Sequence, residues 1–155
     1  MQEGNGRQRG AVATSFYIAI CILLIDQFCK YLVRSKLTFG ESIPVIKNVL
    51  HLTLSHNTGA AFGIFQHHTH FLTFLSILTI LVILMFYRKI SHSKRIFRIS
   101  IGLIAGGASG NLIDRLMFGY VVDFLDFQVW PVFNIADSAI TVGVMLLIWK
   151  MIKHS

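Results

Sequence analysis

Three aspartates lie within hydrophobic segments of this chain, where a carboxylate is costly to bury and is functional by default. They are Asp26, Asp114 and Asp137. Asp114 ends one segment and Asp137 begins the next, so two antiparallel helices would bring their carboxylates face to face. Such a pair shares one proton, and it can deprotonate water while protonating a carbonyl oxygen. The residues therefore suggest hydrolysis of an amide bond by Asp114 and Asp137.

A structural role for the same aspartates remains open. Asp137 comes early in its predicted helix, where an acid complements the helix dipole, and Asp114 precedes Arg115 as a possible ion-pair partner. Asp26 and Lys30 have the i, i+4 spacing of a same-face ion pair, in the more favourable order. That pair fits a structural role at least as well as a catalytic one.

Two asparagines precede the predicted pair at one common spacing. Asn111 lies three residues before Asp114, and Asn134 lies three residues before Asp137. This spacing places both side chains on one face of a helix. The amides could orient the carboxylates or bind a peptide backbone, and Asn134 could instead cap its helix.

Other chemistries have weaker support in the sequence. No Ser-x-x-Lys motif occurs, and Ser138 has no evident partner other than Asp137. The histidines at 67, 68 and 70 form a cluster without an adjacent acid. We therefore predict no metal site and no cofactor.

The composition is that of an integral membrane protein. Of the 155 residues 54% are hydrophobic and 14% charged, and the mean hydropathy is +0.66. These values are too apolar for a soluble domain of this size. A basic excess on a membrane chain usually sets its orientation, so the net charge of +7 does not predict a nucleic-acid partner.

The hydrophobic segments predict an all-α bundle of four transmembrane helices with a small extracytoplasmic β-sheet, in one domain of residues 1–155. The helices are expected at residues 11–33, 70–87, 99–116 and 133–149. Most of the flanking basic residues lie beside the termini and in the short second loop, which predicts that both termini are cytoplasmic. The outer loops are then residues 34–69 and 117–132, and all three aspartates lie near the extracytoplasmic face.

The first outer loop is predicted to contain the sheet. Residues 50–55 alternate between apolar and polar, as a short strand does, and residues 44–46 could pair with them across a turn at 47–48. An irregular loop is the alternative. The small residues that follow, from Asn57 to Gly63, permit close approach of a helix or a bound peptide.

The second outer loop is unusually apolar around Asp123 and Asp126. Its aromatic residues suit an anchor at the membrane interface, and a wall for a lipid-bearing substrate is the second interpretation. In the preceding helix Gly102, Gly106 and Gly110 recur every four residues, which predicts close packing of a neighbouring helix.

Five pieces of the chain resemble the blocks of bacterial lipoprotein signal peptidase (signal peptidase II), in the order of that family and from about residue 13 to 150. They are Asp26-Gln27-Phe28-Cys29-Lys30, Asn57-Thr58-Gly59-Ala60-Ala61-Phe62, Gly110-Asn111-Leu112-Ile113-Asp114-Arg115, Val121-Val122-Asp123-Phe124 and Phe133-Asn134-Ile135-Ala136-Asp137-Ser138.

The resemblance implies a four-helix aspartic peptidase of the bacterial inner membrane. It would cut prolipoproteins before the cysteine that carries a diacylglyceryl group, and globomycin-type cyclic peptides would inhibit it. Its partners would be these substrates and membrane lipids. By carry-over, Asp114 and Asp137 match the catalytic pair. Asn57, Asn111, Arg115 and Asn134 match polar residues of the substrate site, and Asp26, Lys30, Gly59 and Asp123 match further motif positions.

Two functions of other classes compete with a peptidase. A small proton- or ion-coupled transporter would also place acids within helices, although here the acids gather at one face. A structural subunit would use its polar residues only to join helices.

Overall fold

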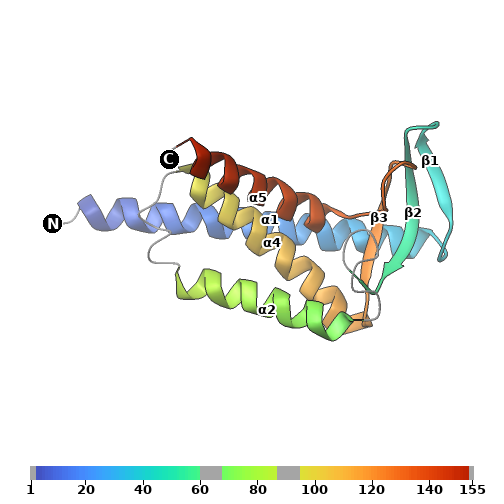
Figure 1. Ribbon diagram of the computed structural model, residues 1–155, viewed down its shortest axis with the longest axis horizontal. Helices are drawn as coiled ribbons and strands as arrows, with labels where there is room; N and C mark the ends of the chain where they lie inside the picture. The colour runs from blue at the N-terminus through green and yellow to red at the C-terminus, as the bar shows by residue number, and fades with distance from the viewer. Residues whose placement is uncertain (1–2, 60–67, 87–94, 154–155) are drawn as a thin grey trace.

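The structure is a computed structural model that describes residues 3–59, 68–86 and 95–153, with side chains from residue 13 onward. The described residues form four helices with a three-stranded sheet at one end of the bundle (Figure 1). The helices are α1 (Glu3–Lys36), α2 (Thr69–Met85), α4 (Arg95–Phe118) and α5 (Ile135–Ile152), and the strands are β1 (Ser42–Ile46), β2 (Leu50–Asn57) and β3 (Val121–Asp126).

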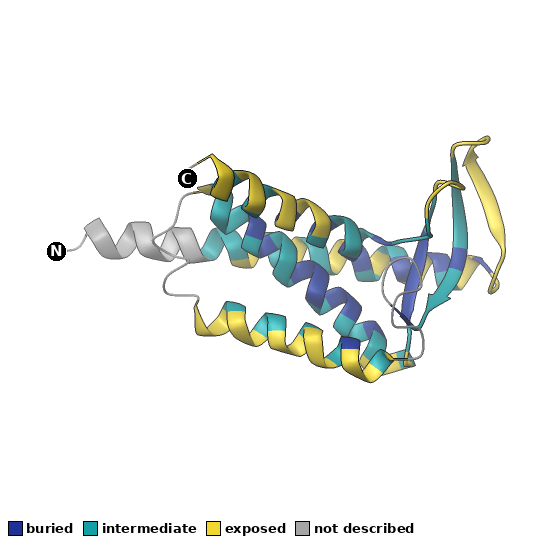
Figure 2. Ribbon diagram, in the orientation of Figure 1, coloured by how far each residue is buried: buried dark blue, intermediate teal, exposed yellow. Residues whose placement is uncertain are grey.

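The four predicted helices are confirmed, with bounds that differ by a few residues at most ends. The helical segments 13–36, 95–118 and 135–152 are long and apolar enough to cross a membrane, while α2 is apolar but has only 17 residues. Large apolar side chains are exposed on the outer faces of the helices. Many of the buried residues lie along α4 and β3 (Figure 2). An apolar exterior of this extent suits contact with lipid.

Helix α4 packs against α1, α2 and α5, and its glycines allow the closest of these contacts. The stripe of Gly102, Gly106 and Gly110 faces α1, which confirms the predicted close packing of a neighbouring helix. A Cβ added at Gly106 would lie 2.6 Å from the carbonyl oxygen of Ala19. The backbones of α1 and α4 therefore meet where a side chain would keep them apart.

Substitution Gly106→Ala is expected to lower the free energy of unfolding by about 1–3 kcal/mol, because the new methyl group meets backbone that cannot turn away. Thermal unfolding in detergent would measure the change. Met117→Ala is the control, because Met117 is 68% exposed on the same helix. An unchanged midpoint for Gly106→Ala would contradict the close contact.

The predicted hairpin of the first outer loop is confirmed. Strands β1 and β2 pair antiparallel, and Asn48 in the turn has a φ of 60°, which Asn tolerates better than most residues. In the second outer loop, residues 121–126 form a third strand that was not predicted from the sequence. It pairs with β2 in the order β1-β2-β3, with Ser55 opposite Asp123.

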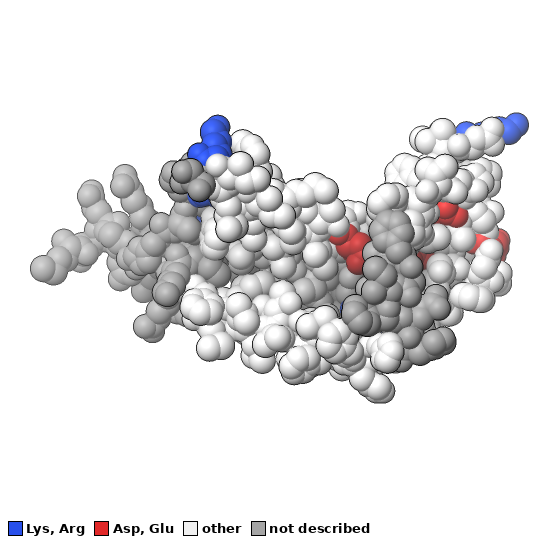
Figure 3. All heavy atoms as spheres, in the orientation of Figure 1, with Lys and Arg blue, Asp and Glu red and all other residues white. Residues whose placement is uncertain are grey.

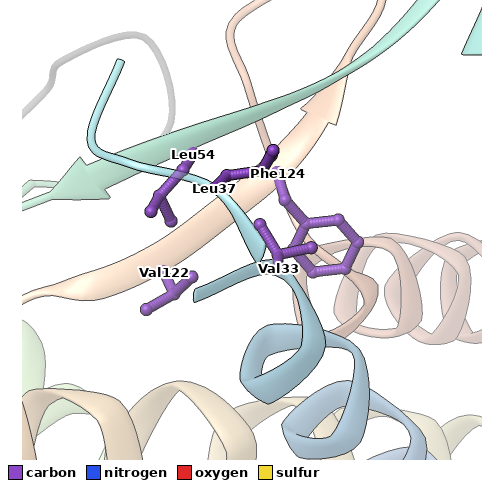
Figure 4. Close-up of a cluster of buried hydrophobic side chains, with 5 residues drawn as sticks. All are labelled: Val33, Leu37, Leu54, Val122 and Phe124. Atoms are coloured by element: carbon purple, nitrogen blue, oxygen red, sulfur yellow. The ribbon is translucent and has the colours of Figure 1, made fainter. Parts of the chain in front are cut away.

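The sheet is attached to the bundle through one apolar face. Leu54 of β2 and Val122 and Phe124 of β3 pack against Val33 and Leu37 at the end of α1 (Figure 4). Because side chains alternate along a strand, this packing turns Asp123 to the other face, toward the start of α5.

Candidate active site

A group of polar side chains is buried where the helices meet the sheet, and α1, α4, β3 and the start of α5 all contribute to it. The members with less than a twentieth of their surface exposed are Asp26, Lys30, Asn111, Asp114, Asp123 and Asn134. Buried polar groups at this density require partners, and nearly every member is bonded to another.

Lys30 bonds the side chains that α1 and α4 contribute to this group. Its Nζ is 2.8 Å from Asp26 Oδ2 and 2.9 Å from Asp114 Oδ2, and it donates to Asn111 Oδ1 at 3.1 Å. The Asp26–Lys30 ion pair predicted from the sequence is therefore confirmed. Asp26 also accepts the backbone N–H of Ala136 at 2.9 Å, which ties α1 to the first turn of α5.

Asp114 has other partners than the sequence predicted. Besides Lys30, it accepts the amide of Gln27 at 3.0 Å and the backbone N–H of Val122 at 3.0 Å. Its side chain is 1% exposed, and its ion pair is with Lys30 rather than with the adjacent Arg115. With both oxygens occupied by α1 and β3, Asp114 neither hydrogen-bonds Asp137 nor opens toward a substrate.

Two asparagines connect this charged group to Asp137. Asn111 accepts from Lys30 and donates to Asp137 Oδ1 at 2.7 Å. Asn134 is the N-cap of α5, since its Oδ1 accepts the Asp137 N–H at 2.8 Å. Its Nδ2 donates to Asp123 Oδ1 at 2.6 Å. Asn134 thus caps its helix and bonds a carboxylate, two of the three roles left open by the sequence.

The side-chain amide of Asn134 joins Asp123 to α5, because its Nδ2 donates to Asp123 while its Oδ1 accepts the Asp137 N–H. Asn57 of β2 donates to its second oxygen at 2.8 Å, and Asn57 is itself fixed by the Gly59 N–H at 2.9 Å. Burial raises the pKa of Asp123 to about 7, and the negative charge of Asp137 contributes to the shift. Asp123 and Asp137 are thus two carboxylates close enough to influence each other's ionisation.

Asp137 differs from Asp114 in its access to solvent. It is only partly buried, and acidic atoms are visible in the hollow between the helices and the sheet (Figure 3). Among the residues that the structure describes, its carboxylate accepts a hydrogen bond from Asn111 through Oδ1, and its second oxygen accepts none. This is the arrangement expected of a group that must meet a substrate.

Arg115 reaches the edge of the site from α4. Its guanidinium donates to the Gly59 carbonyl oxygen and to Ser76 Oγ, each at 3.5 Å. These long bonds join α2 and the residues just after β2 to the site. Arg115 also carries the positive charge that acts on Asp137, Asp123 and Asp114.

The weaker candidates do not join the site. Ser138 donates to the Asn134 carbonyl oxygen at 2.9 Å, as a helix serine often does, rather than to Asp137. His67 lies outside the described residues. Within the part of the chain that the structure describes, no group of three or more His, Cys, Asp or Glu side chains could hold a metal ion.

The family is decided by comparison with known proteins. The family model described as "Signal peptidase (SPase) II" matches residues 18–153. The chain belongs to the signal peptidase II family. This is a family of aspartic peptidases, so its members are enzymes and the transporter and structural-subunit interpretations are set aside.

Similar proteins extend the match over nearly the whole chain. The Moorella thermoacetica protein named "Lipoprotein signal peptidase" is 47% identical over 135 residues, covering 87% of this chain and 90% of its own. The protein of that name from Halothermothrix orenii is 47% identical over 141 residues, covering 89% and 97%.

A solved bacterial membrane enzyme, determined by the in meso method at 2.3 Å, superposes with a TM-score of 0.86 at 36% identity. The match covers 91% of this chain and 88% of that one. The fold is thus that of a multi-pass bacterial membrane enzyme.

Proposed function

We propose that this signal peptidase II removes the signal peptide from diacylglyceryl-modified prolipoproteins, cutting just before the lipidated cysteine. The names of its relatives, lipoprotein signal peptidases, support this substrate class. The observation that carries the proposal is the pair of Asp123 and Asp137, held by three asparagines at the end of a membrane bundle. Globomycin-type inhibitors would occupy the same site.

In this proposal Asp123 replaces Asp114 as the catalytic partner of Asp137. Both carboxylate oxygens of Asp114 accept hydrogen bonds, one from α1 and one from β3. Asp114 therefore serves as a positioning residue that holds Val122, and with it Asp123, in place. The pKa of Asp123 is raised, and the charge of the nearby Asp137 contributes to that shift. Both features are expected of an acid–base pair of carboxylates.

In the proposed mechanism the shared proton starts on Asp123, whose pKa is raised by burial. Asp137 takes a proton from water as the water oxygen attacks the scissile carbonyl carbon, and Asp123 gives its proton to the carbonyl oxygen. The tetrahedral diol then collapses. Asp137 gives its proton to the leaving nitrogen, Asp123 recovers one from a diol hydroxyl, and the C–N bond breaks.

The placement of the site fits a lipid-bearing substrate. Both termini are proposed to be cytoplasmic, which puts the sheet and the aspartate pair near the extracytoplasmic face of the inner membrane. The apolar exterior of the helices would contact membrane lipids and the acyl chains of the substrate. Asn57, Gly59, Asn111, Arg115 and Asn134 are proposed to line or support the peptide-binding site.

The pKa of Asp123 predicts how cleavage depends on pH. Above about pH 7 Asp123 loses the proton that it must donate, so kcat/KM is expected to fall about tenfold per pH unit. Asn57→Ala removes a hydrogen bond that lowers this pKa, so the alkaline limb should move to higher pH. The pH profile of both enzymes tests this. A wild-type kcat/KM that is flat from pH 6 to 9 would contradict it.

A further inference from the structure

Arg34 is a half-buried cation in the last turn of α1, at the end of the bundle that carries the sheet (Figure 1). Among the residues that the structure describes, the ion pairs to acidic side chains belong to Lys30, and none involves Arg34. Nor does the buried Nε of Arg34 find a hydrogen-bond partner there. The described part of the chain therefore does not neutralise this charge.

Aromatic rings hold the guanidinium of Arg34 in a fixed plane. Its Cζ lies 4.2 Å from the centre of the Phe118 ring. The Phe118 ring lies 5.9 Å from that of Tyr120, which in turn stacks on His56 at 3.9 Å. A guanidinium that rests on a ring presents its planar N–H edge sideways, and this edge matches two oxygens of a phosphate. We call Arg34, Phe118, Tyr120 and His56 the Arg34 cluster.

His56 does not add a second positive charge to the cluster near neutral pH. Burial lowers the pKa of His56, and the positive charge of Arg34 lowers it further. The imidazole therefore stays neutral where an unperturbed histidine would begin to gain a proton. Arg34 is thus the cation to which an anion at this cluster would bind.

The Arg34 cluster lies at the depth of phospholipid headgroups. The span that begins at Ala13 reaches Arg34 after about 31 Å of helix, about the thickness of a hydrocarbon core. Tyr31 is exposed on the same side of α1, three residues earlier, and Leu116 and Met117 are exposed at the end of α4. Acyl chains that cover these apolar side chains would bring their phosphate to the level of Arg34.

We propose that Arg34 binds the phosphate of a membrane phospholipid, in the extracytoplasmic leaflet under the orientation proposed above. The guanidinium edge pairs with the phosphate oxygens, and the acyl chains of the same lipid lie along Tyr31, Leu116 and Met117. Inorganic phosphate has the same oxygens without the chains, so the experiment separates these two sources. The proposal does not depend on the cleavage chemistry.

Thermal unfolding of the full-length enzyme in a nonionic detergent measures this binding, because a ligand of the folded state raises the thermal midpoint. Three additions are compared: phosphatidylglycerol, a diacylglycerol with the same acyl chains, and inorganic phosphate. Phosphatidylglycerol should raise the midpoint by about 3 °C or more, and the other two by less than about 1 °C. An equal rise with diacylglycerol would assign the effect to the acyl chains, and an equal rise with inorganic phosphate would assign it to a soluble anion. Either result would overturn the proposal.

Three variants assign the effect to one side chain. Arg34→Gln should raise the half-saturating mole fraction of phosphatidylglycerol by about fivefold or more. Lys36→Gln removes the same charge from an exposed position in the same turn, and it should change this fraction by less than about twofold. Arg34→Lys keeps the charge without the planar fork, so it should lie between the two.

The midpoints without lipid show whether these variants are folded and separate binding from packing. If Arg34 only packs on Phe118, Arg34→Gln would lower the midpoint by the same amount with and without phosphatidylglycerol. Its response to the lipid would then equal that of Lys36→Gln, and this result would overturn the proposal.

Discussion

Replacing Asp123 or Asp137 by Asn is expected to lower kcat for prolipoprotein cleavage by about 10³-fold or more, because each change removes one half of the acid–base pair. The fold should survive. Asn keeps the shape of Asp and can still accept through its oxygen from Asn134 at position 123, or from Asn111 at position 137. Cleavage of a diacylglyceryl-modified prolipoprotein, followed by gel shift, measures the loss.

Stability gives a second readout for the same variants. Each Asn substitution removes a carboxylate from a crowded acidic site, so the thermal midpoint should stay the same or rise. Glu41→Gln is the control for removal of a carboxylate, because Glu41 is exposed and bonds Thr38 outside the site, and its kcat should change by less than a factor of two. Variants of Asp123 and Asp137 that are inactive only because they unfold would not support the pair.

Lys30→Met is expected to lower the free energy of unfolding by about 3–5 kcal/mol, because it leaves the buried carboxylates of Asp26 and Asp114 without their cation. The loss should propagate to the site, since Asn111 loses the ammonium donor that fixes its amide. Thermal unfolding and the yield of folded enzyme measure the effect.

The comparison variant is Lys36→Met, which removes the same charge from an exposed position in the last turn of α1. Its midpoint should match that of the wild type. If Lys30→Met were as stable as Lys36→Met, the buried ion pairs would contribute nothing and the account of the charged group would fail.

The helices and the hairpin could be predicted because their signals are local. Long apolar segments predict spans, the alternation at 50–55 predicts a strand, and the stripe from Gly102 to Gly110 predicts close packing. Strand β3 was missed because Asp123 is flanked by apolar residues on both sides. The first four residues of β3 are all buried, on both faces of the sheet. The strand therefore shows no alternation between apolar and polar residues.

The proposed pair of Asp123 and Asp137 differs from the predicted pair of Asp114 and Asp137 because two motifs of equal spacing compete in the sequence. Asn111 and Asp114 repeat the spacing of Asn134 and Asp137, which suggests two equivalent halves. The difference lies in α1, whose Lys30 and Gln27 occupy Asp114. Contacts between segments so distant in sequence cannot be read from either motif, and nothing local in the sequence distinguishes Asp123 as the partner that we propose for Asp137.

The most direct measurement compares single-turnover cleavage by Asp123→Asn and Asp114→Asn in EDTA at a temperature where both are folded. We expect the wild type to cleave in EDTA, since two carboxylates suffice for the chemistry. Asp123→Asn should be slower by about 10³-fold or more, and Asp114→Asn by about 10–100-fold through displacement of the site. A folded Asp114→Asn that is inert, beside an Asp123→Asn that still cleaves well, would contradict the account and return Asp114 to the catalytic pair.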